Sequence, residues 1–480
     1  MNVESFIRRA LETAFVLAVA ASATQAHPLP SRLSPEFHKN RLEEIYRRCP
    51  DGLILLRGEL DWFRKRELRA FDPSFHEPNF RQEKTLYYLT GIEVPDSFVL
   101  IDPRKREVHL YTDWKGEREL IEVKKQGLVS AIHPAAAFLR DARIRAADYD
   151  TLYTLYVPFV EDGTLFGKTG VMTGIFPAGM GEPVTEESQF ARRLAELFPG
   201  LRIKSLHPVV SDMQKIKQSE EIRLIREANA VSVKGVREAM KAVRPGLYDH
   251  DISAVIEYTF LRNGAAGPTF ANNLMSGPHM FMKLVELWAD YSHLDRELKS
   301  GDGIFIDIGA EIGYYQSDIG RTAPVSGRFT PEQRKLYDIY LICYLEALHS
   351  VRPGITQRDL VNICARAMDR QLPSLKEPYL RKAAEQFIKD IDAHPALGHY
   401  EDMNVIGAGA DNDEPLRPGM VFAIEPVLYV PDMSFAVFIE DVVLVTENGY
   451  EVLSKGLPYT PDEVEAVMAE RSIIETLGSK

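Results

Sequence analysis

The chain has 480 residues and a formal net charge of −13, from 57 basic and 70 acidic side chains. That length fits two domains, and a composition with 45% hydrophobic and 26% charged residues excludes a disordered or collagen-like chain. The net negative charge repels phosphate backbones, so no nucleic-acid partner is expected.

The N-terminus has the order of a signal peptide, which we assign to residues 1–26. Two arginines precede an apolar run from Ala14 to Ala23, and small residues follow up to Ala26. The run is shorter than the roughly 20 residues of a membrane-spanning helix, so we expect removal of the segment and no stable membrane insertion. The mature protein is then exported, to the periplasm or the exterior.

The chain contains three cysteines, Cys49, Cys343 and Cys364. An odd number cannot form a complete disulfide framework, so packing has to provide the stability of the exported protein. Cys343 and Cys364 lie in helical apolar patterns, which favours buried structural thiols over reactive ones.

Residues 35–208 predict a first domain of mixed α/β type. Short apolar runs at 52–56, 97–102 and 108–111 alternate with charged, helix-like stretches. The segment 209–223 predicts the domain boundary, because it leads to Ser219 as a candidate N-cap with two glutamates behind it.

Residues 215–472 predict a second domain that combines helices and strands. Its first, long amphipathic helix ends at the stop signal Arg-Pro-Gly at 244–246, and the same tripeptide recurs at 352–354. A new helix follows each tripeptide, so the domain either contains an internal duplication or repeats this order by coincidence.

Two acids interrupt apolar strands at the centre of this domain. If the turn between the strands is centred on Ile312 and Gly313, Asp307 lies directly opposite Asp318 on one face of a hairpin. Like charges at that range raise the pKa of one carboxyl sharply unless a cation lies between them. The pair therefore predicts a bound cation.

A second pair of strands repeats the pattern. A turn centred on Asp432 and Met433 places Glu425 opposite Glu440, and His399 is the natural nitrogen ligand between the two hairpins. A single such acid is more often ion-paired or solvated, but four apolar strand positions occupied by acids indicate a shared cause. Four carboxylates and one imidazole predict a pair of divalent ions, Mn²⁺ first, with Co²⁺, Fe²⁺ or Zn²⁺ also suited.

With these residues in place, the chain resembles the pita-bread metallopeptidases, among them the Xaa-Pro aminopeptidases (aminopeptidase P) and Xaa-Pro dipeptidases. The resemblance implies a creatinase-like α/β N-terminal domain and an α+β pita-bread catalytic domain. The segments that carry it are 80–83, 86–91, 299–311, 318–322, 329–334, 417–426 and 439–441.

The resemblance also implies roles for the five candidate ligands. Asp307 would bind one metal, His399 and Glu425 the other, and Asp318 and Glu440 would bridge the two. A hydroxide between the ions would be the nucleophile, with Glu425 as the candidate proton acceptor. The implied substrate is a peptide with proline second, and the implied assembly is a homo-oligomer, either a dimer or a tetramer.

Three positions depart from the family pattern. Asp290 and Ile406 stand where proton-transferring histidines are usual, and Phe438 replaces an arginine two residues before the final glutamate. Loss of a positioned acid or base typically costs about 10²–10⁴ in rate. His279 and His293 are the candidate substitutes, and His394 is a further one.

Three functions follow from this pattern. The leading hypothesis is a dinuclear Xaa-Pro aminopeptidase. The second is a creatinase-like hydrolase of a non-peptide C–N bond on the same fold. The third is a catalytically silent relative that binds metal or peptide, which the three departures favour.

Overall fold

The structure is a computed structural model that describes residues 32–59, 80–156, 186–281, 296–394, 396–404 and 413–477. The predicted signal peptide lies outside these ranges, as do Asp290, His293 and Ile406. Within the described ranges, the structure contains no helix with the length and apolar character that a membrane crossing requires.

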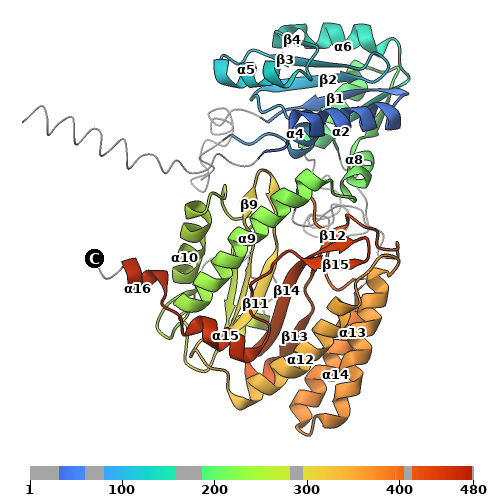
Figure 1. Ribbon diagram of the computed structural model, residues 1–480. Coiled ribbons are helices and arrows are strands. Elements are labelled where there is room, and N and C mark those ends of the chain that lie inside the picture. Colours follow the sequence, from blue (N-terminus) through green and yellow to red (C-terminus); the bar gives the residue numbers. More distant parts are fainter. Residues whose placement is uncertain are drawn as a thin grey trace, which may run out of the picture.

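The first domain is a mixed sheet with helices on it, at the top of Figure 1. Its strands run in the order β4-β3-β2-β1-β5-β6, and both parallel and antiparallel neighbours occur, as expected for an α/β domain. The strands are β1 (Gly52–Arg57), β2 (Ser97–Asp102), β3 (Glu107–Thr112), β4 (Ala131–His133), β5 (Thr151–Thr154) and β6 (Arg202–Ser205). The helices are α2 (Pro35–Arg48), α4 (Lys84–Thr90), α5 (Glu117–Gln126), η1 (Ala135–Ala137), α6 (Phe138–Ala146), α7 (Glu186–Leu197) and α8 (His207–Gln214).

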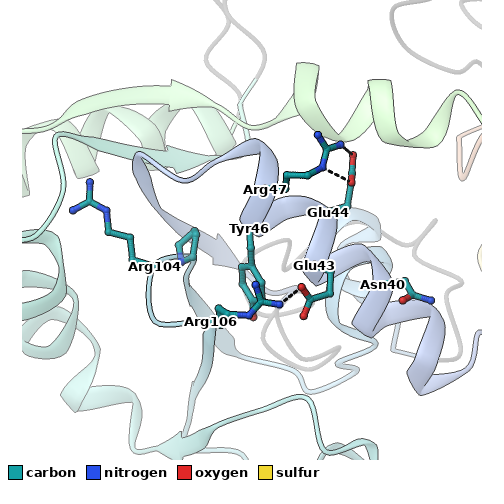
Figure 2. Close-up of a pocket in the computed structure, with 8 residues that line it drawn as sticks. Asn40, Glu43, Glu44, Tyr46, Arg47, Arg104 and Arg106 are labelled. Carbon is teal, nitrogen blue, oxygen red and sulfur yellow. Dashed lines mark hydrogen bonds and ion pairs between the residues drawn. The ribbon is translucent and has the colours of Figure 1, made fainter.

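The surface of this domain has a hollow between α2 and the turn after β2 (Figure 2). The charged side chains that line it already pair with one another, Arg47 with Glu44 and Arg106 with Glu43. It therefore offers no set of free groups for chemistry.

The second domain is built on one antiparallel sheet, with strand order β12-β14-β11-β8-β7 and with β13 and β15 paired to β14. The strands are β7 (Asn273–Ser276), β8 (Gly303–Ile308), β11 (Ile319–Pro324), β12 (Val421–Ile424), β13 (Val427–Val430), β14 (Phe435–Thr446) and β15 (Gly449–Val452), with the small hairpin β9 (Glu311–Ile312) and β10 (Tyr315–Gln316). The helices are α9 (Ser219–Ala242), α10 (Asp249–Arg262), η3 (Gly277–Phe281), α12 (Pro331–His349), α13 (Gln357–Gln371), η4 (Leu372–Ser374), α14 (Pro378–Ala393), η5 (Pro431–Met433), α15 (Pro461–Met468) and α16 (Ile473–Leu477).

Helix α9 begins one residue before the position that the sequence predicts. The N-cap is Gln218 rather than Ser219, because the Glu221 carboxylate accepts a hydrogen bond from the Gln218 backbone N–H at 2.7 Å. Glu221 is fully buried and also accepts from the Tyr315 hydroxyl at 2.9 Å. A long-range contact thus decides where the helix starts.

The two halves of this domain repeat one arrangement, which supports the duplication hypothesis. Gly246 and Gly354, at the ends of the two Arg-Pro-Gly tripeptides, have φ values of 89° and 88°. Their N–H groups donate to the carbonyls of Leu298 and Leu416, at 2.9 and 2.8 Å. Asp307 follows Leu298 by the same number of residues as Glu425 follows Leu416. In Figure 1, α9 and α10 flank the yellow half of the sheet and α12 to α14 the red half.

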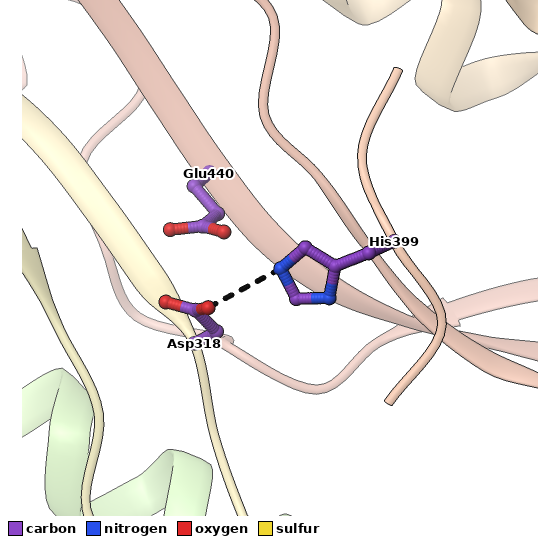
Figure 3. Close-up of side chains that lie close together, drawn as sticks. All are labelled: Asp318, His399 and Glu440. Atoms are coloured by element: carbon purple, nitrogen blue, oxygen red, sulfur yellow. Dashed lines mark ion pairs between the residues drawn. The ribbon is translucent and has the colours of Figure 1, made fainter. Parts of the chain in front are cut away.

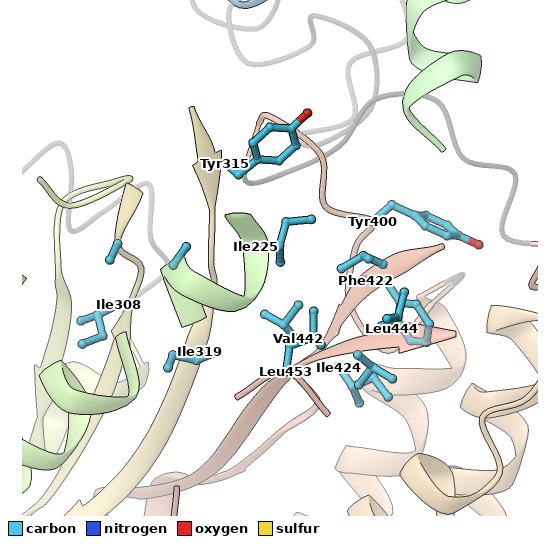
Figure 4. Packing of buried hydrophobic residues seen from close by; sticks show 14 of the residues in the cluster. Ile225, Ile308, Tyr315, Ile319, Tyr400, Phe422, Ile424, Val442, Leu444 and Leu453 are labelled. Carbon is cyan, nitrogen blue, oxygen red and sulfur yellow. The ribbon is translucent and has the colours of Figure 1, made fainter. Parts of the chain in front are cut away.

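The sheet has a buried apolar face against α9. Ile308 and Ile319 pair across β8 and β11 and are completely buried. Alternation along a strand turns them away from Asp307 and Asp318. Figure 4 shows them beside Ile225 of α9. This packing leaves the opposite face of β8 and β11 for the acids.

The two domains meet at the tip of the β9–β10 hairpin. The ring of Tyr314 stacks on Tyr87 with centroids 4.1 Å apart, and its hydroxyl donates to Glu93 at 2.9 Å. Arg81 lies over the Tyr314 ring and pairs with Glu311. The first-domain segments that carry the family resemblance therefore hold the hairpin that joins Asp307 to Asp318.

Candidate metal centre

The first acid pair lies in a register that differs from the prediction. Asp307 is opposite Gly320, not Asp318, because the turn is centred on Gly313 and Tyr314. Both turn residues have positive φ, 56° and 73°, as a type I′ turn requires. The stacking of Tyr314 on Tyr87 explains how a bulky residue holds that conformation. The shift is two residues, so Asp318 stays on the face of Asp307.

The second acid pair has the predicted register. Ile424 pairs with Asp441 and Val427 with Phe438, so Glu425 stands opposite Glu440 between β12 and β13. Glu440 also pairs with Gly320 on its other side. Asp307, Glu440 and Glu425 thus share one face, which we call the metal face.

His399 reaches the metal face from a separate segment. Residues 397–401 run beside β12, with the Ala423 N–H donating to the His399 carbonyl and the Glu425 N–H to the Leu397 carbonyl, both at 2.8 Å. Gly398 allows this approach, because a Cβ there would lie 2.3 Å from the Ala423 carbonyl oxygen. The backbone of β12 thereby positions both His399 and Glu425.

The side chains of Asp318, His399 and Glu440 point toward one another (Figure 3). Each offers one ligand atom, and these three atoms lie within 4.8 Å of one another. The three residues form a group that could hold a metal ion. His399 Nε2 lies 3.3 Å from Asp318 Oδ2 and 3.5 Å from Glu425 Oε1. Asp307 is oriented by Asn273, whose amide donates to it at 2.9 Å.

Burial and mutual repulsion shift the pKa values of these groups. Burial and then the Asp318 charge raise the pKa of Asp307 and of Glu440 well above the ordinary carboxyl value. Burial raises the pKa of Glu425 to about 7. Burial favours neutral His399, but the hydrogen bond to Asp318 and the Glu425 charge outweigh it and raise the pKa of His399 to about 10.

These residues fit a pair of divalent cations. Asp307 Oδ1, Asp318 Oδ1 and both oxygens of Glu440 are buried and have no hydrogen-bond partner among the described residues. An unpartnered buried carboxylate oxygen costs several kcal/mol, and a cation removes that cost. Oxygen donors with one imidazole are typical of Mn²⁺ and of other first-row divalent ions.

Comparison with known protein families identifies the kind of domain that contains this centre. The model of metallopeptidase family M24 matches residues 223–447, the part of the chain that contains all five candidate ligands. The chain contains a domain of this family. Its first domain matches the aminopeptidase P N-terminal domain over residues 38–127.

Relatives extend the M24 match over most of the chain. The Xaa-Pro aminopeptidase of Haemophilus influenzae is 27% identical over 459 residues, which cover 90% of this chain and 97% of that protein. The Xaa-Pro aminopeptidase of Escherichia coli is 32% identical over 276 residues, 54% of this chain and 61% of that protein. The solved structure of Pseudomonas aeruginosa aminopeptidase PepP shares the fold, with TM-score 0.71 and 24% identity over 92% of this chain and 99% of that one.

Of the histidines proposed as substitutes for the missing ones, His279 and His394 fall within the described residues. His279 lies in η3, and His394 caps the C-terminus of α14, where its carbonyl accepts from Arg358 at 2.9 Å. Neither belongs to the group around Asp318 in the described part of the chain. Phe438 is buried and stacks on Phe305 with centroids 3.9 Å apart, so an apolar pair fills the space of the expected arginine.

A buried network behind the metal face was not predicted from the sequence. Arg321 pairs with Asp441 at 2.8 Å, and its guanidinium also donates to the Glu440 carbonyl at 2.6 Å. The hydroxyls of Tyr344 and Tyr459 donate to Asp441 at 2.7 and 2.9 Å. The signal was available, because Arg321 and Asp441 follow the two bridging candidates within the resembling segments.

Proposed function

We propose that this chain is a dinuclear metal-dependent aminopeptidase that releases the N-terminal residue from peptides with proline in the second position. The observation that carries the proposal is the convergence of Asp318, His399 and Glu440, flanked by Asp307 and Glu425, on one face where Asp318 and Glu440 are buried. Two divalent ions bound there would activate a water molecule and polarise the scissile carbonyl. The relatives named Xaa-Pro aminopeptidase in Escherichia coli and Haemophilus influenzae support the substrate class.

The residues of the chain have separable tasks in this reaction. Asp307 and His399 hold opposite ends of the centre, and Asp318 and Glu440 lie between them. Glu425 would serve as the acceptor of a proton from the attacking water. Tyr87 and Arg81 of the first domain hold the β9–β10 hairpin in place beside this face.

A silent metal-binding relative is the second candidate, and Phe438 is the observation that favours it. Its stacked, buried ring cannot supply the charge of an arginine. If the missing histidine is what limits activity, Ile406→His should create or greatly raise turnover. If that substitution does not raise turnover, the result counts against the hypothesis of a catalytically silent protein.

The test is hydrolysis of a short Xaa-Pro-Xaa peptide by the manganese-reconstituted protein, with the matching Xaa-Ala-Xaa peptide as substrate control. We expect cleavage after the first residue of the proline peptide and loss of at least 10³ in kcat/KM for Asp318→Ala. A fully metal-loaded protein with no turnover on any Xaa-Pro peptide would contradict the proposal.

Manganese, export and oligomeric assembly belong to the same proposal. Metal-stripped protein should regain most activity with Mn²⁺, and N-terminal sequencing of the exported protein should show a start after Ala23 or Ala26. Light scattering of the purified protein tests the expected dimer or tetramer.

A further inference from the structure

Glu401 is a buried carboxylate on the same side of the chain as His399. Residues 397–401 are extended beside β12, and the Glu401 N–H donates to the Val421 carbonyl at 3.0 Å, two residues along from the Ala423 to His399 bond. An isolated bridge pairs Tyr400 with Phe422 in the same register. Because side chains alternate, Glu401 and His399 lie on one face and Tyr400 on the other.

Glu401 is buried and lacks hydrogen-bond partners among the described residues, as Glu440 of the metal face does. Its side chain is 2% exposed, and neither carboxylate oxygen has a hydrogen-bond partner among the described residues. The next residue, Asp402, is also buried but is satisfied, because its carboxylate accepts from the Asn404 N–H at 2.6 Å. The unpartnered state therefore belongs to Glu401 and not to every acid of this segment.

A structural ion pair does not account for Glu401. The buried ammonium of Lys217 donates to the Gln214 carbonyl at 2.6 Å and forms no ion pair with Glu401 within the described residues. The register against β12 places the Glu401 side chain on the face of His399, which belongs to the group formed with Asp318 and Glu440. The carboxylate thus faces the metal centre.

We propose that Glu401 is an additional carboxylate of the metal centre, serving the divalent ion on the His399 side either directly or through one water. The inference rests on the two-metal site of the proposed function. The five ligands that the family resemblance implies do not include this position. A further hard, anionic oxygen donor favours ions such as Mn²⁺ over Zn²⁺.

The test is titration of metal-stripped protein with Mn²⁺ by calorimetry, which needs no peptide. We expect Glu401→Gln to weaken binding of one of the two ions by about 10–100-fold, the range seen when a supporting carboxylate is lost. Asp402→Asn is the matched control and should bind both ions as the unsubstituted protein does. Asp318→Ala, which removes a bridging candidate, should abolish tight binding of both.

Thermal stability provides a second readout. Glu401→Gln is melted beside the unsubstituted protein, without metal and with saturating Mn²⁺. Its gain in melting temperature on addition of Mn²⁺ should be smaller.

Equal Mn²⁺ affinity and an equal metal-induced gain in Glu401→Gln would overturn the inference. Unchanged metal binding with a raised KM for peptide would also overturn it, in favour of a substrate contact. If the unsubstituted protein binds two ions but cleaves no Xaa-Pro peptide, the proposed activity fails while this inference is still decided by the titration.

Discussion

Gly320 separates the two acids that face each other across β11, since it pairs with Asp307 on β8 and with Glu440 on β14. A Cβ at this position would lie 2.0 Å from the Phe438 ring and 2.8 Å from the Ile306 carbonyl oxygen. The ring is itself stacked and buried, so it cannot move aside at low cost. The missing side chain therefore sets the spacing of the acids.

Gly320→Ala should lower the free energy of unfolding by about 1–3 kcal/mol, the usual cost of overpacking a filled core. It should also weaken Mn²⁺ binding, because β11 must shift away from β14. Urea denaturation and metal titration measure the two effects. Gly449→Ala is the control, since nothing lies within 4 Å of the added Cβ there. Identical behaviour of the two variants would contradict the argument.

At the scale of elements, the β9–β10 hairpin connects the first domain to the metal face. Tyr314 at its tip contacts Tyr87, Glu93 and Arg81. Asp307, near the end of β8, precedes the hairpin, and Asp318, just before β11, follows it. The Gln82 N–H also donates to the Tyr314 hydroxyl at 3.1 Å. The position of two metal ligands is thus coupled to packing between domains.

Tyr314→Ala should cost about 3–5 kcal/mol in stability, the range for removal of a buried aromatic ring, and should weaken Mn²⁺ binding. Tyr314→Phe keeps the stacked ring and loses the hydroxyl, so it should cost about 1 kcal/mol and bind metal normally. Denaturant unfolding and metal titration of both variants separate the ring from the hydroxyl. If Tyr314→Phe binds Mn²⁺ more weakly and Tyr314→Ala does not, the ring is not the element that couples the first domain to the metal face.

At the scale of the whole molecule, buried acids from distant parts of the chain are brought together without a counter-charge of equal size. In the metal-free protein the folded pKa values of Asp307, Glu440, Glu425 and His399 all lie above their ordinary values. The folded state then binds more protons than the unfolded state, so the stability of the metal-free protein falls as pH rises. Metal ions bind the deprotonated ligands and reverse this dependence.

As pH rises, the metal-free protein should therefore lose stability in two pH ranges, one set by Glu425 and one by His399. Glu425 contributes stability that is complete below the ordinary carboxyl pKa and is lost as pH rises through about 7. His399 contributes stability that is complete below about 6.5 and is lost as pH rises through about 10. Calorimetry from pH 5 to 9, with EDTA and with saturating Mn²⁺, should show a falling melting temperature in the first series and no comparable fall in the second.

Removing the titrating group isolates the first window. Glu425→Gln in EDTA should show a flatter decline between pH 5 and 7 than the unsubstituted protein. The same slope in both proteins would mean that other groups control the dependence.

The elements that sequence pattern determined are those encoded locally. Alternation along apolar strands was enough to place Glu425 and Glu440 on one face, and the turn at 431–433 fixed their register. Short motifs between residues 80 and 441 indicated the resemblance to the metallopeptidase family, and the M24 match over residues 223–447 confirms it. Both features depend on residues within a short stretch of chain, where steric rules and turn chemistry are sufficient.

Contacts between residues far apart in the chain decided the rest. The register of Asp307 differs from the predicted one because Tyr314 adopts a positive φ, which tyrosine does not favour. Its stacking on Tyr87 of the other domain accounts for that conformation. Glu401 becomes a candidate for the metal centre only through burial against β12 and the nearness of Asp318. Burial, stacking and charge interaction depend on distance in space, and the tertiary fold alone sets those distances.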